Sequence, residues 1–270
     1  MPTYTVDDVT LHYAEYGSAD GLPVMLLHAF PLSGGMWQPQ AEALVASLGC
    51  HVIVPDLRGS GASSVPLGPY PMERMAADVL ALADHLGLAS FVLGGLSMGG
   101  YVSFAVLRAA PDRLRALILA DTRPGADTAD GQRAREGLAQ LAEREGAAPI
   151  AETMLPNLLS ATGLASGAIP DRVRALILAN SGAGIAGAAR GMALRPDASD
   201  LLPTIACPTL IIVGEQDLVT PPHFAQTMFE SIPNATLQVI SDAGHLSNME
   251  QPDAFADIVE HFLRALPTAS

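Results

Sequence analysis

Short apolar runs alternate with stretches of helical periodicity along most of the chain, and this alternation limits the possible folds more than any other feature. Two β-rich runs come first, at 4–6 and 11–16, and resemble an antiparallel hairpin. Further strands are predicted at 24–27, 52–54, 91–96, 114–119, 210–213 and 236–240, and helices at about 36–48, 72–86, 98–109, 222–231 and 252–265. This alternation predicts an α/β fold with a mostly parallel, twisted sheet and helices on both faces.

The alternation stops between Asp121 and Leu210, where helical patterns continue but no convincing strand occurs. A stretch of this length exceeds any ordinary connection within a compact domain. We therefore predict a helical cap at 123–196, inserted into a core domain made of 1–122 and 197–270.

Two segments of the predicted cap have more than one interpretation. VRALILA at 173–179 repeats the predicted strand LRALILA at 114–120 almost unchanged, but Pro170 and Asp171 before it are typical helix-start residues, so we predict a helix. GAGIAG at 182–187 has the written form of a dinucleotide-binding fingerprint. That motif requires a strand ending in an acidic residue about 20 positions further on, and none follows. We assign the glycines to a loop and helix of the cap.

Charge and composition exclude several classes of protein. The 270 residues are 49% hydrophobic and carry a formal net charge of -14, so nucleic acid and anionic membranes are not expected partners. Cys50 and Cys207 lack the spacing of a metal site, and we expect two buried, reduced thiols. Because neither a signal-peptide pattern nor an uninterrupted apolar run of about 18 residues occurs, we predict a soluble cytoplasmic protein.

The stretch GGLSMGG at 94–100 carries the main chemical signal. Gly95, Ser97 and Gly99 match GxSxG, the nucleophile elbow, in which a sharp strand-to-helix turn exposes the serine hydroxyl. Small residues are needed on both sides because strand and helix pass within contact distance there. Since the match lies between an apolar strand pattern and the helical YVSFAVLRAA, it predicts that Ser97 is a nucleophile.

A serine hydroxyl needs a base, and the base needs a third group to orient it. In this type of elbow both partners follow the serine in the chain. Asp217 and His245 each come after a predicted strand, and the carboxyl ends of parallel strands share one edge of a sheet. We therefore expect these two side chains beside Ser97. Asp121 stays open as an alternative acid and His223 as an alternative base.

The oxyanion that forms during acyl transfer needs two preorganised donors. The backbone N–H of Met98 follows Ser97 at a helix start, where free N–H groups point outward. The second donor must come from the loop HAFPLSGGMW after the strand at 24–27, and the N–H of Phe30 is the candidate.

Taken together, five segments resemble the α/β-hydrolase fold superfamily. Within it, the chain is similar to small carboxylesterases, cofactor-free haloperoxidase-like perhydrolases and 3-oxoadipate enol-lactonases. The segments are HAFPLSGGMW (28–37), PDLRGSGAS (55–63), GGLSMGGY (94–101), GEQDLVTP (214–221) and AGHLSNMEQP (243–252).

The resemblance implies a role for each candidate. Ser97 is the nucleophile, His245 the general base and Asp217 its orienting acid. The N–H groups of Phe30 and Met98 form the oxyanion hole.

The resemblance also bears on two neighbouring residues of the oxyanion loop. By the same resemblance, His28 shapes this loop rather than titrating in catalysis. The sequence departs from the family at Ala29, where glycine is common, and alanine would cost energy if that position needs a positive φ.

The expected activity is hydrolysis of carboxylic esters with small acyl groups through an acyl-enzyme, with no metal or organic cofactor. The expected partner is a small-molecule ester or lactone, and the oligomeric state stays open. The candidate pocket residues are His28, Trp37, Met154, Leu155 and Leu158. The three from the cap either wall an acyl pocket or pack the cap on the core.

Other activities fit the same triad. An enol-lactonase would act on a dicarboxylate-type lactone, and perhydrolysis of the acyl-enzyme would be a side activity. A third hypothesis for the function is a non-enzymatic receptor or signalling protein of the same fold. The cap arginines that could supply a cation for an anionic lactone are Arg133, Arg135, Arg144, Arg172 and Arg174.

Overall fold

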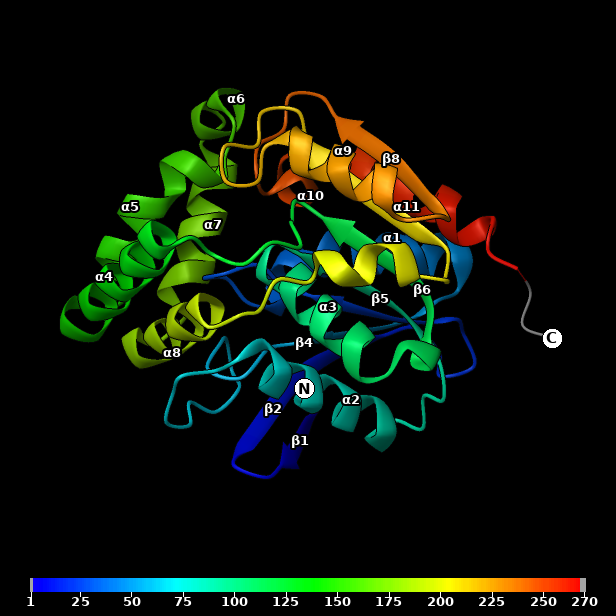
Figure 1. The fold of residues 1–270 in the computed structure, drawn as a ribbon, viewed down its shortest axis with the longest axis horizontal. Coiled ribbons are helices and arrows are strands. Elements are labelled where there is room, and N and C mark those ends of the chain that lie inside the picture. Colours follow the sequence, from blue (N-terminus) through cyan, green and yellow to red (C-terminus); the bar gives the residue numbers. More distant parts are fainter. Residues whose placement is uncertain (1, 268–270) are drawn as a thin grey trace.

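The computed structural model describes residues 2–267, and these form an eight-stranded sheet with helices on both faces (Figure 1). The strands are β1 (Thr3–Val6), β2 (Val9–Tyr16), β3 (Pro23–Leu27), β4 (His51–Pro55), β5 (Phe91–Leu96), β6 (Leu114–Ala120), β7 (Thr209–Gly214) and β8 (Ala235–Ile240). Their order in the sheet is β1-β2-β4-β3-β5-β6-β7-β8. The first two strands form the predicted antiparallel hairpin, and β2 also pairs antiparallel with β4. The pairings from β4 through to β8 are parallel, so the predicted α/β fold is confirmed.

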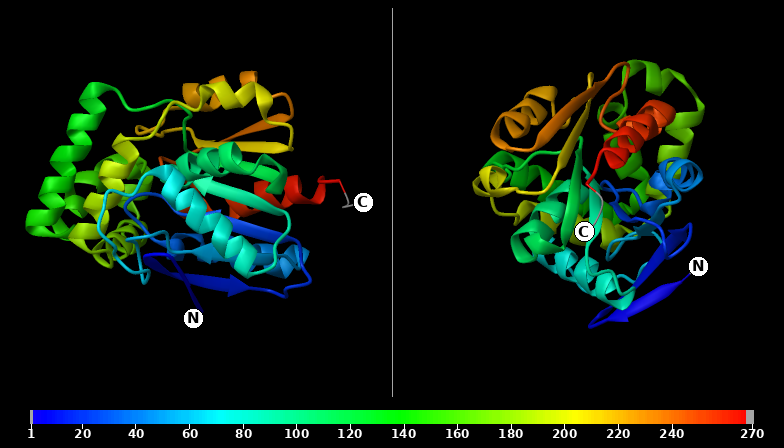
Figure 2. Two further views of the ribbon diagram at one scale, coloured as in Figure 1. Left: turned by 60° about the horizontal axis from the view of Figure 1, so that its bottom comes forward. Right: turned by 90° about the vertical axis from the view of Figure 1, so that its right-hand side faces the viewer.

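Helices cover the sheet on both sides (Figure 2). On one face lie α1 (Gln38–Leu48) and α11 (Pro252–Arg264), and on the other α2 (Met72–His85), α3 (Met98–Ala109) and α9 (Pro222–Ser231). Strands β3 to β7 are almost entirely buried, which explains why they appear in the sequence as continuous apolar runs. The short helices are η1 (Gly34–Trp37), η2 (Pro111–Arg113), η3 (Ser199–Thr204) and α10 (Ser247–Glu250).

One predicted helix differs in detail. The stretch at 36–48 is divided, because 34–37 form a 3₁₀ turn and the α-helix begins at Gln38. Pro39 lies in the first turn of that helix, where its fixed φ and missing N–H are tolerated.

The strand order reverses at β3. The chain passes from β3 to β4 on one side and later returns to β5 on the other side. In open α/β sheets, ligands bind at such a reversal, beyond the carboxyl ends of the strands. Leu27 at the end of β3 pairs with Gly95 in β5, so the loop that begins at His28 and the turn at Ser97 lie at one edge of the sheet.

Five α-helices lie between β6 and β7, on the left of Figure 1, before the 3₁₀ helix η3. They are α4 (Ala129–Glu145), α5 (Ala147–Leu158), α6 (Ala161–Ala165), α7 (Ala168–Leu178) and α8 (Gly182–Ala193). The repeated segment VRALILA falls mainly in α7, as its preceding proline and aspartate predicted. We refer to these five helices as the cap, and its boundaries at 123 and 196 stay a prediction.

The glycine motif at 182–187 forms part of α8. Helix α7 precedes it where a dinucleotide fold has a strand, and Ser181 caps the helix by accepting a hydrogen bond from the N–H of Gly184. A Cβ atom on Gly184 would lie 1.9 Å from the carbonyl oxygen of Gly59, and one on Gly191 would lie 1.7 Å from that of Tyr70. These glycines therefore let the cap helix lie against a loop of the core.

Two further predictions concern the cysteines and membrane spans. Both cysteines are free, and Cys50 is buried as predicted. Cys207 is only partly buried, so the prediction of a buried thiol is wrong for this residue. Among residues 2–267, no helix combines the length and apolar character needed to cross a bilayer.

A buried ion pair joins the two segments that connect the cap to the core. A guanidinium nitrogen of Arg195, after α8, lies 2.9 Å from a carboxylate oxygen of Asp127, before α4, and both side chains are at most 3% exposed. Arg195 also donates a hydrogen bond to the carbonyl of Gly125 and lies over the Tyr101 ring, 4.1 Å from its centroid. The two connecting segments are thereby fastened to each other and to α3.

We expect Asp127→Asn to lower the free energy of unfolding at pH 7 by about 3 kcal/mol, because it leaves Arg195 buried without its counter-charge. Burial raises the pKa of Asp127, but hydrogen bonds from Arg195 and Arg135 outweigh it and lower the pKa to about 2. Since the ordinary value is 3.8, the ion pair stabilises the fold fully above about pH 4 and loses this effect as the pH falls toward 2.

Urea denaturation of wild type and variant between pH 7 and pH 2 measures both effects. The pKa shift corresponds to about 2 kcal/mol of acid-sensitive stability, which the variant should lack. Equal losses of stability in the two proteins between pH 4 and pH 2 would contradict the assignment.

Candidate active site

Ser97 lies at the turn from β5 to α3 with φ 55° and ψ −111°. Non-glycine residues rarely adopt a positive φ, and a strained backbone of this kind costs about 1–3 kcal/mol. The neighbouring strand holds the turn in place. The N–H of Ser97 donates to the carbonyl of Ala120 at 3.0 Å, and its carbonyl accepts from the hydroxyl of Thr122 at 2.9 Å. The sequence motif therefore forms the sharp turn that it predicted.

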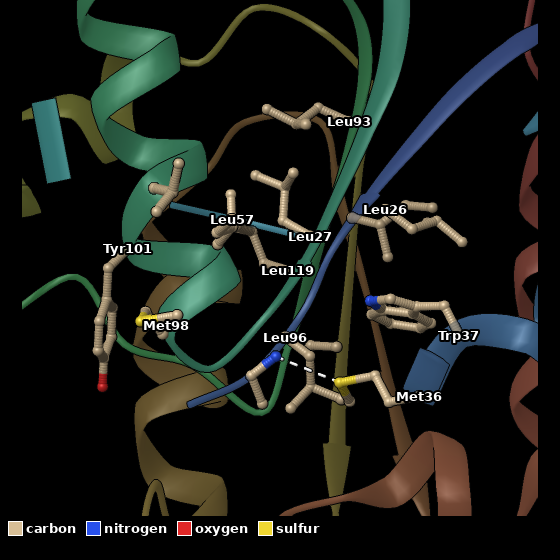
Figure 3. Packing of buried hydrophobic residues seen from close by; sticks show 14 of the residues in the cluster. Leu26, Leu27, Met36, Trp37, Leu57, Leu93, Leu96, Met98, Tyr101 and Leu119 are labelled. Atoms are coloured by element: carbon tan, nitrogen blue, oxygen red, sulfur yellow. Dashed lines mark hydrogen bonds between the residues drawn. The ribbon is translucent and has the colours of Figure 1, made fainter. Parts of the chain in front are cut away.

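The glycines of the elbow are needed because other atoms occupy the space of a side chain. A Cβ atom on Gly95 would lie 2.3 Å from the carbonyl oxygen of Gly99, and one on Gly99 would lie 2.2 Å from that of Leu27. Helix α3 thus begins in contact with the end of β3, as Figure 3 shows around Leu27 and Met98. The outer glycines are crowded by side chains instead, Gly94 by the movable end of Leu26 at 2.7 Å and Gly100 by Thr122 at 2.4 Å.

Asp217 and His245 form a buried hydrogen-bonded pair. The Nδ1 atom of His245 lies 2.9 Å from Oδ2 of Asp217, and the two side chains are at most 1% exposed. Asp217 follows β7 and His245 follows β8, so neighbouring parallel strands bring them together. With Nδ1–H donating to the carboxylate, Nε2 carries the lone pair that can accept a proton.

Hydrogen bonds keep the Asp217 carboxylate charged. Its Oδ1 atom accepts from the N–H groups of Val219 and Thr220, and its Oδ2 atom accepts from the Thr220 hydroxyl at 2.7 Å. Burial raises the pKa of Asp217, but His245 and these donors outweigh it, and the pKa is lowered. Sequence reasoning missed Thr220, although a hydroxyl three residues after an aspartate in a turn is a recognisable signal.

Asp121, the alternative acid, contacts other groups. Its Oδ1 atom accepts from the N–H of Gly214 at 2.8 Å, and its Oδ2 atom accepts from the hydroxyl of Ser247. Complete burial, and then the charge of Asp217, raise the pKa of Asp121 well above its ordinary value. Asp121 thus lies near the pair, but His245 is hydrogen-bonded to Asp217.

Three other histidines, including the alternative base His223, have local partners. His223 packs its ring against Phe224 at the start of α9. The Nδ1 atom of His12 lies 2.9 Å from Asp56, and Nε2 of His51 lies 2.6 Å from Glu15.

The two proposed oxyanion donors lie at the strand-order reversal. Neither the N–H of Phe30 nor that of Met98 has a backbone or side-chain acceptor within hydrogen-bonding distance in residues 2–267. Met98 is the first residue of α3, where the helix dipole also favours a negative charge. Both N–H groups are therefore unpaired within the described residues, and their role as oxyanion donors stays a prediction.

Ala29 causes no backbone strain. It is absent from the residues with positive φ, so the left-handed conformation that would favour glycine does not occur there. Its N–H points to the sulfur of Met36 at 3.2 Å, which Figure 3 shows as a dashed line. The conformational energy that alanine would cost at a positive φ is therefore not incurred at this position.

His28 is fully buried, and both of its ring nitrogens are occupied. Nδ1 bonds to the carbonyl of Ala29 at 2.9 Å, and Nε2 accepts from the N–H of Leu57 at 3.0 Å. Burial lowers the pKa of His28, with smaller opposing effects from the Ala29 carbonyl and Asp56. A neutral His28 therefore holds the oxyanion loop to the loop after β4.

The remaining candidate pocket residues have different surroundings. Trp37 is 1% exposed and packs against Phe255 of α11, with ring centroids 5.6 Å apart, so its ring belongs to the core packing (Figure 3). Leu155 and Leu158 are buried in the hydrophobic cluster, and Met154 packs against it from a partly buried position. A pocket wall built from the three cap residues stays a prediction.

Comparison with known proteins identifies the class. A model of the alpha/beta hydrolase fold family matches residues 23–252. The chain therefore belongs to this family, as its motifs predicted, and it is a hydrolase.

Individual relatives match over nearly their whole lengths. 3-Oxoadipate enol-lactonase 2 of Acinetobacter baylyi is 34% identical, over 97% of this chain and 96% of its own length. An esterase from Thermogutta terrifontis, solved with malate bound, is 44% identical with a TM-score of 0.93, covering 96% of this chain and 95% of its own. The enol-lactonase from Burkholderia xenovorans is 29% identical with a TM-score of 0.90, covering 97% and 100%.

Proposed function

We propose that the protein hydrolyses carboxylic esters of small acyl groups through an acyl-enzyme on Ser97. The buried pair of Asp217 and His245 is the observation that carries this proposal, because it supplies an oriented base on the required edge of the sheet. The free N–H groups beside Ser97 support it further.

The reaction proceeds in two halves. The Ser97 hydroxyl attacks the ester carbonyl carbon while its proton passes to Nε2 of His245, and the N–H groups of Phe30 and Met98 stabilise the oxyanion. The carbon–alkoxide bond then breaks, and His245 returns its proton to the departing alcohol. Water, deprotonated by His245, attacks the acyl-serine and releases the acid. These steps use only protein groups and water.

Hydrolysis of a lactone is the second candidate, favoured by the 34% identity to an enol-lactonase over 97% of the chain. The charges favour a neutral substrate instead. Of the five cap arginines considered as binding groups for an anion, four lie within 4 Å of a carboxylate, and Arg172 bonds to the carbonyl of Gly35. The four are Arg133 with Asp130, Arg135 with Asp127, Arg144 with Glu145, and Arg174 with Glu152 and Asp171.

A substrate panel and covalent labelling test the proposal together. We expect hydrolysis of p-nitrophenyl acetate and butyrate, and a single fluorophosphonate adduct on the peptide that contains Ser97. An adduct elsewhere, or no hydrolysis of any ester, would contradict the proposal. A kcat/KM for a dicarboxylate enol-lactone at least 10-fold above that for the neutral esters would replace it with the lactonase alternative.

A further inference from the structure

The cap is tied to the oxyanion loop by one buried side chain. Asn180 follows α7 and is 7% exposed. Its Nδ2 atom donates to the carbonyl of Pro31 at 2.7 Å and lies 3.3 Å from that of Leu32, the two residues after Phe30. Its Oδ1 atom accepts from the N–H of Gly61 at 2.6 Å. One amide from the cap therefore holds two loops of the core, including the loop that carries a proposed oxyanion donor.

A second buried group ties the cap to the histidine loop. The Oε1 atom of Glu250 accepts from the N–H of Gly244 at 2.7 Å. Its Oε2 atom accepts from the N–H and hydroxyl of Ser160, between α5 and α6, at 2.9 and 2.6 Å. The residues on both sides of His245 are held, because the N–H of Leu246 donates to the carbonyl of Leu158 at 3.1 Å.

Core and cap approach each other closely at this second site. A Cβ atom on Gly244 would lie 2.6 Å from the backbone nitrogen of Ser160, and one on Gly163 would lie 2.1 Å from the Glu250 carboxylate. Glu250 is 7% exposed, so water cannot readily replace these hydrogen bonds. The position of the histidine loop is thus set jointly by core and cap.

We propose that the cap positions the catalytic loops through these two anchors, with Asn180 and Glu250 as positioning residues for Phe30 and His245. The inference rests on the proposed function of Ser97. A shift of about 1 Å in a reacting group can cost about 100-fold in rate, so the loss of either anchor should appear in kcat. Within the described residues, neither side chain hydrogen-bonds to Ser97 or His245.

The test compares Asn180→Ala and Glu250→Gln with two matched controls. Asn157 is an exposed amide on α5, and Glu230 is an exposed carboxylate on α9, so Asn157→Ala and Glu230→Gln remove the same groups elsewhere. Both carboxylate oxygens of Glu250 accept a hydrogen bond from a backbone N–H, one from Gly244 and the other from Ser160. In Glu250→Gln, the side-chain NH₂ group would replace one of these oxygens and face an N–H donor. We expect kcat for p-nitrophenyl acetate to fall about 10- to 100-fold in both anchor variants, with KM within 3-fold and both controls near wild type.

Two further measurements separate positioning from a merely structural role. Rates are divided by the concentration of sites titrated with fluorophosphonate, so that unfolded protein does not count. Inhibition by an aryl trifluoromethyl ketone, whose adduct with serine carries an oxyanion, should weaken in Asn180→Ala by the same factor as kcat. Asn180→Asp keeps the acceptor for Gly61 but loses the donor to Pro31, and should be at least as impaired as the alanine variant.

The possible failures can be distinguished. If Ser97→Ala is inactive while both anchor variants keep the wild-type kcat per titrated site and wild-type inhibition, the inference is overturned and the proposed function stands. If Ser97→Ala retains wild-type activity, both are overturned. A lower melting temperature with unchanged kcat per site would also overturn the inference, because the anchors would then only stabilise the fold.

Discussion

Ser97→Ala is expected to lower kcat for p-nitrophenyl acetate by about 10⁶-fold, because loss of the nucleophile removes the acyl-enzyme pathway altogether. The variant should remain folded, since alanine fits the space of serine and the hydrogen bonds of Ser97 to Ala120 and Thr122 use only its backbone. The strained φ of 55° stays in the variant, so its stability should be near that of wild type.

The measurement is steady-state hydrolysis followed at p-nitrophenolate absorbance, with circular dichroism melting of both proteins. Ser47→Ala is a suitable control, because Ser47 is an exposed serine in the last turn of α1 whose hydroxyl bonds only to the carbonyl of Ala43. It should keep the wild-type rate. Activity above one-tenth of wild type in a repurified Ser97→Ala preparation would exclude Ser97 as the nucleophile.

Asp217→Asn is expected to lower kcat by about 10⁴-fold, the loss typical when the orienting carboxylate of a Ser-His-Asp triad becomes an amide. An asparagine amide would donate toward Nδ1 of His245 and favour the tautomer with its proton on Nε2, where it cannot accept a proton from Ser97. The hydrogen bonds from Val219 and Thr220 would still hold the side chain in place through its oxygen.

Asp121→Asn is the matched control. Because burial and the charge of Asp217 raise the pKa of Asp121, folding favours its protonated form, and this contribution to stability is lost as the pH rises through the folded-state pKa. A neutral asparagine avoids that loss, so the variant should be at least as stable as wild type at pH 7 and keep kcat within about 3-fold. A larger fall in kcat for Asp121→Asn than for Asp217→Asn would reverse the assignment of the acid.

The sequence predicted the parts of the site that depend on local pattern and chain order. Ser97 was identifiable because an apolar strand, a glycine-flanked serine and a helix follow one another directly. Asp217 and His245 were identifiable because each follows a strand, and parallel strands deliver their ends to one edge. The structure brings the last two together as expected.

The groups that sequence reasoning missed depend on contacts between distant parts of the chain. Asn180 bonds to Pro31, and Glu250 to Ser160, across separations of 149 and 90 residues, and no local pattern marks such pairs. Trp37 was a candidate pocket residue, but its ring packs against Phe255, a contact across more than 200 residues of sequence that no local pattern marks. The cap arginines were candidates for binding an anionic substrate, but carboxylates of the cap pair with them, from the same helix for Arg133 and from a neighbouring helix for Arg174.

The ion pair between Asp127 and Arg195 has a kinetic consequence when taken with the two anchors. A cap fastened at its connecting segments, at the oxyanion loop and at the histidine loop cannot swing open as a rigid body without breaking buried hydrogen bonds at all three places, each costing about 1–3 kcal/mol. The state with the whole cap open is therefore expected to be rare, and ester turnover is expected to proceed without it. A water–lipid interface should accordingly give no activation.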